Sequence, residues 1–396
     1  MKKVIFTLAL IVGEIFLPLR AFSQNSLDSV LVNINNNNKS IVAYNQFLKA
    51  EKVRFNTGLS LNDPTIEYDY LKGTPADAGN QIDFTAIQSF DFPTVYGKRK
   101  EVSRASIDRL GILEKEFRQQ VLLEAKLIYL KLIYLNNFES QLNKRNANAE
   151  RLLVALKVKF DKGGVSYLDI NKAKINLSLI QNELRAVLDD INESTQQLIE
   201  LNGGFELEVT DTIYPIVEKL APMEAIFNKA KIGNFAIQNI QKGQQISEKK
   251  EELNKALALP KIEAGFRYQS ILGQTFNGFH VGLSIPLFEN KNKVQAAKQE
   301  TIYFGLLEES HINKLRNELE ALYNKAKSLK QGMTNYNHLF NEMNSEELLN
   351  KAFKLGEISN IEYFMELQYA YLALENYLKQ QRDYHLVISE LKKYEL

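Results

Sequence analysis

A pattern that returns after 193 residues constrains the fold of this chain more than any single motif does. It is carried by a proline followed by basic residues, by a glycine-containing turn and by an acid just beyond that turn. The paired copies are Pro93-x-x-x-Gly97-Lys98-Arg99-Lys100 with Pro286-x-x-x-Asn290-Lys291-Asn292-Lys293, Phe160-x-x-Gly163-x-Val165-Ser166 with Phe353-x-x-Gly356-x-Ile358-Ser359, and Asp169 with Glu362. A long internal period indicates a duplicated structural unit. We therefore predict a first unit at residues 24–203, a linker at 204–222 and a second unit at 223–396.

Each predicted unit contains two short segments in which apolar and polar residues alternate. These segments lie at about residues 65–71, 81–92, 262–268 and 278–285. Alternation with period 2 predicts half-buried strands, and roughly eight to twelve residues is close to the length of a tilted strand that crosses a bilayer. The apolar positions would then face lipid and the polar positions a wet lumen. The candidate lumen residues are Glu67, Asp69, Asp83, Asp91, Glu263 and Arg267, for which a solvated interior without any role in selectivity is the alternative.

Four strands are too few to close a sheet within one chain. Two isolated hairpins make a poor soluble sheet, and open edges are not tolerated in lipid. The pattern therefore predicts that the strands of several copies of the chain join into one closed sheet.

The rest of each unit is predicted to be helix. Residues 94–162 contain no proline, and their apolar residues recur at spacings of three, four and seven, which is typical of coiled coils. Such a helix spans roughly 100 Å, which is longer than any compact domain. Residues 166–201 are expected to return antiparallel to it, and residues 289–354 and 359–394 repeat the hairpin. Residues 26–60 and 223–258 are each predicted as one further helix.

Residues 1–23 have the organisation of a signal peptide. Lys2 and Lys3 precede an apolar stretch, Val4 to Val12, that is too short to span a bilayer, and Ala21-Phe22-Ser23 offers small residues for cleavage before Gln24. An uncleaved anchor is the alternative, and either interpretation predicts export across the inner membrane. The chain has no cysteine, which excludes disulfides, thiolate metal sites and an N-terminal lipid anchor on cysteine.

The composition and motifs give no sign of an enzyme. The sequence has no phosphate-binding loop, HExxH motif, nucleophile elbow or cysteine nucleophile, so we predict no catalytic residue and no cofactor. None of the four histidines has the spacing of a metal-ligand set, and no metal site is predicted; they are His280, His311, His338 and His385. A net charge of +1 gives no support for a nucleic-acid partner.

Taken together, the duplicated unit and its motifs resemble the TolC-like outer membrane efflux proteins, and the resemblance covers essentially all of the mature chain. The resemblance is carried by the doubled unit, by Phe92-Pro93 followed by Gly97-Lys98-Arg99, and by the doubled Phe-x-x-Gly-x-(Val/Ile)-Ser turns. The segment from Gln88 to Arg99 looks like the CzcC-like branch that serves heavy-metal RND pumps. The family implies a mainly α fold with membrane β structure: a homotrimer whose twelve strands, four per chain, form an outer-membrane β-barrel continuous with a long periplasmic α-helical coiled-coil barrel. The linker would belong to the equatorial region of that tube.

The resemblance also implies a function and partners. The chain would be the passive conduit of a tripartite efflux system in the outer membrane of a Gram-negative bacterium, in contact with outer-membrane lipid and extending into the periplasm. Its partners would be a periplasmic adaptor, or membrane fusion protein, and an inner-membrane pump of RND type, with metal cations or drugs as cargo. The same conduit could serve type I protein secretion. A periplasmic coiled-coil adaptor or scaffold is a third interpretation, but an adaptor has a single long hairpin flanked by a lipoyl-like β domain.

By the same resemblance, a gate is expected where the long helices turn. Its candidate residues are Asp169, Glu362 and Glu366, which in a trimer would supply rings of carboxylates. Ordinary acids near helix N-termini, where negative charge is favoured, are the alternative. The turns themselves would dock the adaptor, and the residues assigned to them are Gly163, Gly164, Val165, Ser166, Leu355, Gly356, Ile358 and Ser359. Glycine in a tight turn, where φ is positive, is the structural explanation for Gly163 and Gly356.

Overall fold

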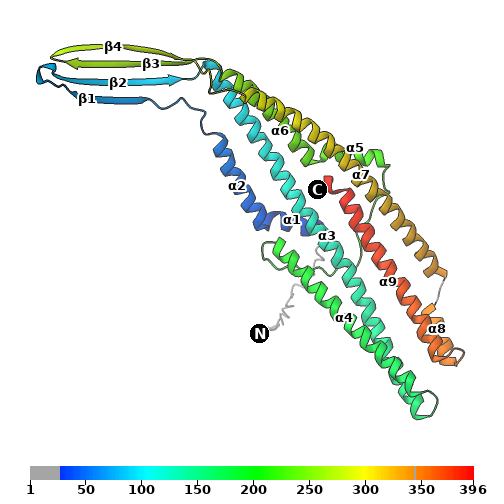
Figure 1. The fold of residues 1–396 in the computed structure, drawn as a ribbon. Coiled ribbons are helices and arrows are strands. Elements are labelled where there is room, and N and C mark those ends of the chain that lie inside the picture. Colours follow the sequence, from blue (N-terminus) through cyan, green and yellow to red (C-terminus); the bar gives the residue numbers. More distant parts are fainter. Residues whose placement is uncertain (1–26, 343–344) are drawn as a thin grey trace, which may run out of the picture.

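The computed structural model describes residues 27–342 and 345–396, so the expected signal peptide lies outside the described residues. The strands are β1 (Thr65–Lys72), β2 (Asn80–Phe90), β3 (Lys261–Ile271) and β4 (Gln274–Ser284). The helices are α1 (Leu27–Asn37), α2 (Lys39–Phe55), α3 (Pro93–Asp161), α4 (Tyr167–Leu201), α5 (Met223–Gly233), α6 (Phe235–Ala256), α7 (Lys293–Glu342), α8 (Ser345–Leu355) and α9 (Asn360–Leu391), with short 3-10 turns at Ala76–Ala78 and Lys393–Glu395. Figure 1 shows the strands as one sheet at one end of a long helical bundle, which we call the shaft.

The sheet is a simple antiparallel meander in the order β1-β2-β3-β4. Its two hairpins, which come from opposite halves of the sequence, join through ten residue pairs between β2 and β3, from Gln81–Ile271 to Phe90–Ile262. The outer edges of β1 and β4 have no strand beside them within the described chain. In Figure 1 the sheet projects beyond the shaft, and none of the described helices covers either of its faces.

The shaft is organised around α3, which has 69 residues and is therefore roughly 100 Å long. Pro93 occupies the first turn of this helix, where proline is tolerated because its missing N–H would have no intrahelical partner. The helix α3 runs from the sheet to the far end of the shaft, and α4 returns beside it (Figure 1). The helices α7, α8 and α9 form the matching path in the second half. None of the described helices is both long and apolar enough to cross a membrane.

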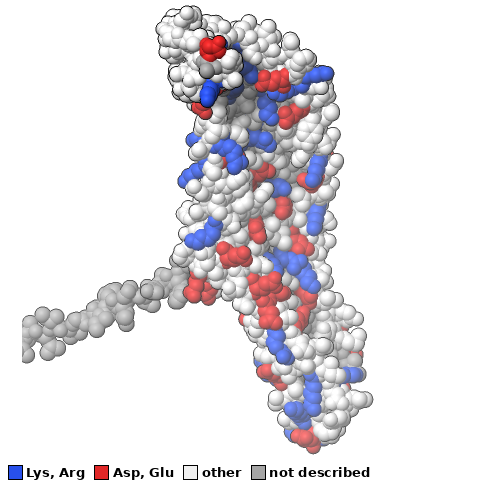
Figure 2. Space-filling model, turned by 60° about the vertical axis from the view of Figure 1, so that its left-hand side comes forward, with Lys and Arg blue, Asp and Glu red and all other residues white. Residues whose placement is uncertain are grey.

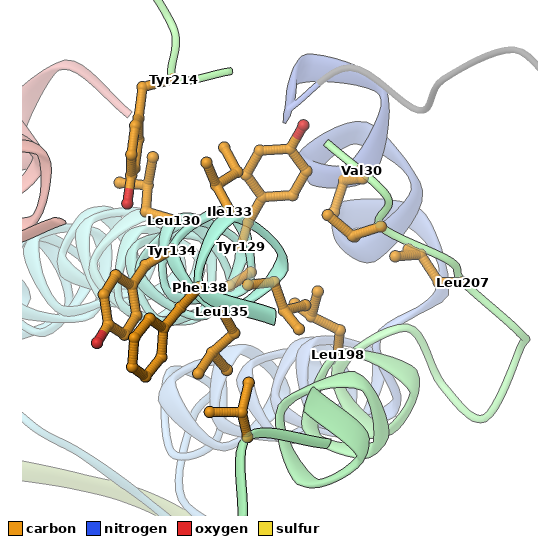
Figure 3. Close-up of a cluster of buried hydrophobic side chains, with 14 of the residues drawn as sticks. Val30, Tyr129, Leu130, Ile133, Tyr134, Leu135, Phe138, Leu198, Leu207 and Tyr214 are labelled. Carbon is orange, nitrogen blue, oxygen red and sulfur yellow. The ribbon is translucent and has the colours of Figure 1, made fainter. Parts of the chain in front are cut away.

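The largest apolar core lies midway along the shaft, where α1, α3, α4 and the linker meet (Figure 3). Leu132, Leu142 and Leu198 are fully buried in it. Residues 205–222 form neither helix nor strand, and this segment packs against the shaft through Leu207 and Tyr214. The amide of Asn136 on α3 donates to the linker carbonyls of residues 209 and 211, over 2.9 and 3.1 Å. In a helix or strand, these two linker carbonyls would accept from backbone N–H groups; here they accept from a side chain instead.

Two helices that the sequence predicted as continuous are each broken at an asparagine. The predicted helix at 26–60 is α1 and α2, separated at Asn38, and the helix at 223–258 is α5 and α6, separated at Asn234. Asn38 accepts from the N–H of Ile41 over 2.9 Å, and Asn234 accepts from the N–H of Ile237 over 3.2 Å. Asparagine is among the best N-cap residues, because its side chain satisfies an N–H that has no intrahelical partner. The continuous prediction was wrong because it followed apolar periodicity and ignored the caps.

Two element boundaries also differ from the prediction. The helix expected from residue 289 begins only at Lys293, after Asn292 with φ of 66°, a left-handed conformation that interrupts a helix. The rest of the helix expected at 289–354 is described as α7 and α8, and its continuity stays a prediction at residues 343–344, which lie outside the described chain. The strand expected at 81–92 ends at Phe90.

Candidate functional site

The two turns at the far end of the shaft have the same backbone geometry. Gly163 and Gly356 have φ of 72° and 76°, a conformation that glycine adopts without steric cost. The N–H of Gly164 bonds the carbonyl of Lys159 over 2.9 Å, and the N–H of Glu357 bonds the carbonyl of Ala352 over 2.9 Å. These bonds form the Schellman arrangement that ends a helix and satisfies its last carbonyls. The predicted glycine turns therefore form at both positions.

Two of the three gate candidates cap the helices that follow the turns. The carboxylate of Asp169 accepts from the N–H and the hydroxyl of Ser166, over 3.0 and 2.8 Å. Glu362 accepts from the N–H of Ser359 over 2.8 Å, and the hydroxyl of Ser359 accepts from the N–H of Glu362. Each pair is a capping box, which satisfies two N–H groups at a helix start. Bonds from the Ser359 backbone and then its hydroxyl lower the pKa of the Glu362 carboxyl.

Capping gives Asp169 and Glu362 a structural role whether or not they also act as a gate. The third candidate, Glu366, lies one helical turn further along α9 and is exposed. The capping role was missed at the level of the sequence, although the Ser-x-x-Asp and Ser-x-x-Glu spacings were available to identify it.

The structure brings both turns together in one small apolar cluster. Tyr363 of α9 stacks on Phe353 of α8 with ring centroids 4.4 Å apart, and the ammonium group of Lys159 of α3 lies 4.5 Å from the centre of the Phe353 ring. Of the proposed docking residues, Val165 and Ile358 are half-buried in this cluster. The other docking residues are exposed: Gly163, Gly164, Ser166, Leu355, Gly356 and Ser359.

The register of the sheet places the predicted strand acids and Arg267 on one face. Glu67 pairs with Thr85, which pairs with Arg267, and Asp69 pairs with Asp83. Because directly paired residues share a face, and residues two apart in a strand do so too, these side chains and that of Glu263 point the same way.

The opposite face of the sheet is apolar. One cross-strand row consists of Ile66, Ala86, Phe266 and Phe279. Phe279 is 95% exposed and Val281 is 80% exposed, so nothing in the described chain covers this face.

Asp91 does not belong with the other predicted lumen residues. It follows the end of β2, and only 4% of its side chain is exposed. Its carboxylate lies 2.6 Å from Nη2 of Arg99 in the first turns of α3, and its N–H bonds the Tyr96 hydroxyl. The prediction that Asp91 occupies a strand position was wrong, because the alternation of residues 81–92 runs past the last strand residue into the connection to α3.

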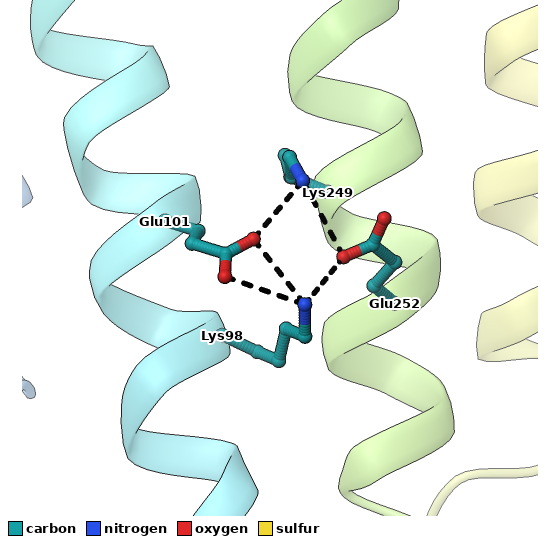
Figure 4. Close-up of polar contacts among 4 residues, drawn as sticks. All are labelled: Lys98, Glu101, Lys249 and Glu252. Carbon is teal, nitrogen blue, oxygen red and sulfur yellow. Dashed lines mark hydrogen bonds and ion pairs between the residues drawn. The ribbon is translucent and has the colours of Figure 1, made fainter.

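Four alternating charges join the start of α3 to the end of α6 (Figure 4). The Nζ atom of Lys98 lies 2.7 Å from the Glu252 carboxylate, and that of Lys249 lies 3.0 Å from the Glu101 carboxylate. All four side chains are partly exposed, so solvent screens these pairs and they add little to stability. The network was missed, although Lys and Glu three residues apart in both segments was an available signal.

One buried charge also lies outside the sequence-based expectations. Arg145 of α3 has 6% of its surface exposed, donates from Nη2 to the carbonyl of Tyr371 over 2.9 Å and stacks its guanidinium 4.5 Å from that ring. Burial lowers the pKa of this guanidinium. The contact fixes α3 against α9 above the turns, and nothing in the sequence distinguished Arg145 from the other basic residues of α3.

The described chain offers no cluster suited to a metal ion. Across residues 27–342 and 345–396, no group of three or more His, Asp or Glu side chains could hold one. The described chain thus combines two open edge strands, an exposed apolar face and a pair of glycine turns at the far end of the shaft.

Several solved structures share this arrangement. A membrane protein from Pseudomonas aeruginosa superimposes with a TM-score of 0.77 at 13% identity, covering 93% of this chain and 89% of its own. CusC gives 0.77 at 11% identity, covering 94% and 92%, and the CmeC outer membrane channel of Campylobacter jejuni gives 0.70 at 14%, covering 93% and 85%. The chain has the TolC-like channel fold. At sequence identities of 11–14%, what these structures share with this chain is the fold. No family model matches the sequence, and no curated protein matches it.

Proposed function

We propose that three copies of this chain form a conduit across the outer membrane and the periplasm of a Gram-negative bacterium. In this assembly, twelve strands close into a β-barrel and the shafts form an α-helical tube. The two units at residues 24–203 and 223–396 are duplicated halves, and the linker at 204–222 belongs to the equatorial region around the tube. The same order of helices, two strands, long helix, turn and helix in both halves supports the duplication.

The single observation that carries this proposal is the sheet. It has an exposed apolar face, a polar face and two open edges, all within four strands of eight to eleven residues. Strands of that length suit a bilayer, and an apolar outer face with a polar inner face is the pattern of a membrane barrel. Open edges are not tolerated in lipid, so closure needs further copies of the chain. Glu67, Asp69, Asp83, Glu263 and Arg267 would then line the lumen.

The proposed partners are a periplasmic adaptor, which contacts the turns, and an inner-membrane pump of RND type. The solved relatives support a channel rather than an enzyme, since CmeC and OprN are described as outer membrane channels and CusC in terms of transmembrane channel formation. The cargo, metal cations or drugs, passes through the lumen without a binding site of its own in the wall.

The assembly is tested with the full-length chain expressed with its N-terminal segment. We expect the mature protein in the outer-membrane fraction, a mass of three chains in detergent by light scattering, and ion conductance in planar bilayers. A monomer that is freely soluble without detergent would overturn the proposal.

The gate is tested by separating charge from capping. Glu362→Gln removes the charge but keeps an amide that can complete a capping box, whereas Ser359→Ala removes part of the cap and keeps the carboxylate. If Glu362 helps to close the tube, Glu362→Gln raises resting conductance in planar bilayers and Ser359→Ala does not. If the wild type and Glu362→Gln conduct equally, the role of Glu362 is to cap α9 and not to close the tube. The same conclusion holds if resting conductance rises only in Ser359→Ala. The same comparison applies to Asp169→Asn with Ser166→Ala.

A further inference from the structure

The two turns differ in charge although their backbones and caps are alike. Residues 157–174 around the first turn contain five Lys and two Asp, a net charge of +3. The corresponding residues 350–367 around the second turn contain two Lys and three Glu, a net charge of −1. The duplicated halves therefore present opposite charge at the same end of the shaft.

The charges at both turns are exposed and available. Lys157, Lys162 and Lys172 are exposed at the first turn, and Glu357 and Glu366 are exposed at the second. Within the described residues, none of these five side chains takes part in an ion pair. The narrow end of the shaft in Figure 2 carries charged side chains on its surface. The fold does not use these charges internally, so they are free to act on a partner.

Each turn combines its charge with an exposed apolar side chain. Leu168 beside the first turn is 69% exposed, and Leu355 in the second is 63% exposed. Each turn therefore offers an apolar side chain for contact with a partner, and the two turns differ in charge. Charge complementarity across an interface mainly fixes register and orientation and suppresses wrong pairings, rather than raising affinity.

We propose that the two turns recognise chemically different helical tips of the adaptor. Acidic side chains of one adaptor hairpin face the basic first turn, and basic side chains of another face the acidic second turn. This inference rests on the proposed docking of an adaptor at the turns. Around a trimer the six turns would alternate in charge, so a ring of partner hairpins can bind in one register and not in the register shifted by one hairpin.

The test uses two synthetic helical hairpins with the same apolar tip, one flanked by Glu and one by Lys. The full-length trimer in detergent carries a photo-crosslinking residue at position 168 or at position 355. At low salt, we expect the acidic hairpin to label position 168 preferentially and the basic hairpin to label position 355. Both preferences should fade as salt rises, because exposed charges are screened.

Charge reversal gives the matched comparison. Lys157→Glu, Lys162→Glu and Lys172→Glu together should weaken binding of the acidic hairpin about tenfold, since three exposed pairs are removed. The control reverses three exposed lysines away from the turns, at Lys115, Lys219 and Lys231, and should leave binding unchanged. Glu357→Lys, which leaves the gate candidate Glu366 unchanged, should weaken binding of the basic hairpin alone, and by less because only one charge is reversed.

The outcomes separate this inference from the proposed function. Equal labelling of both positions by both hairpins would overturn the charge assignment and leave the turns as docking sites. Absence of any labelling on a conducting trimer would overturn docking at the turns as well, but not the conduit. If charge reversal makes the trimer leak or dissociate while hairpin binding is unchanged, the charges join neighbouring copies of this chain and the inference fails.

Discussion

The sheet and the shaft bury apolar surface in opposite ways. In the shaft, Leu142 and Leu198 are completely buried by segments of the same chain. In the sheet, Phe279 and Val281 are almost fully exposed, and the edges of β1 and β4 are unpaired in the described chain. The shaft therefore has a core that one chain supplies by itself, whereas the apolar face of the sheet is covered by nothing in the described chain. The fold of the sheet therefore depends on assembly and environment. Burial of apolar surface is the main driving force for folding and for association alike.

The largest effect is expected from placing a charge on the apolar face of the sheet. Phe279→Arg should cost about 2–4 kcal/mol in each copy if this face contacts the middle of a bilayer. His280→Arg, at the same depth on the opposite face, is the control and should be tolerated. The measurement is the fraction of heat-resistant trimer after refolding into lipid vesicles. Equal losses for both variants would show that the two faces do not differ in environment.

The next largest effect is expected in the core of the shaft. Leu142→Ala should lower the free energy of unfolding by about 3 kcal/mol, because Leu142 is fully buried and the substitution leaves a cavity. Urea unfolding followed by helical circular dichroism measures this loss. Leu179→Ala, at a residue that is 62% exposed on α4, should cost far less. A loss at Leu179 as large as that at Leu142 would show that another chain covers this face, and the contrast between shaft and sheet would weaken.

A smaller effect is expected from pH at the contact between the linker and α9. His385 stacks on Tyr214 with ring centroids 4.1 Å apart, and burial lowers the pKa of His385 to about 4. The unfolded chain therefore binds the proton more readily, and stability falls as pH drops from about 6.5 to 4, by on the order of 2 kcal/mol after allowance for solvent screening.

The matched variant for this prediction is His385→Phe, which keeps an aromatic ring and removes the titration. As pH falls from about 6.5 to 4, the unfolding free energy of the wild type should decrease relative to that of this variant. Above that range the difference between the two proteins should not change with pH. A difference that is the same at pH 7 and pH 4.5 would show that His385 is not held neutral by burial.

The smallest effect is expected at the caps. Ser166→Ala should cost about 1 kcal/mol, because the first turn of α4 loses an acceptor for one N–H group. Hydrogen exchange should quicken in the first turn of α4 and remain unchanged in the core around Leu142. Faster exchange throughout the shaft would mean that the turn is part of the main cooperative unit rather than a local feature.

Much of this fold could be predicted from local patterns. The strands and long helices follow from periodicities of 2 and of three to four residues, and the turns at Gly163 and Gly356 follow from the only residue that adopts positive φ freely. The breaks at Asn38 and Asn234 were missed because periodicity continues across them. Asp91 was misplaced because alternation does not show where a strand ends.

The sequence by itself determined which residues are strand, helix and turn, and that the strands have one apolar and one polar face, because these properties depend on neighbours only a few positions apart. Only the tertiary structure decided that β2 pairs with β3, that Arg145 is buried against Tyr371, and that both turns meet in one cluster. These contacts join residues far apart in the chain, and no local pattern encodes such a distance. The capping roles of Asp169 and Glu362 lie between the two, since their spacing is local and their geometry appears only when the helices form.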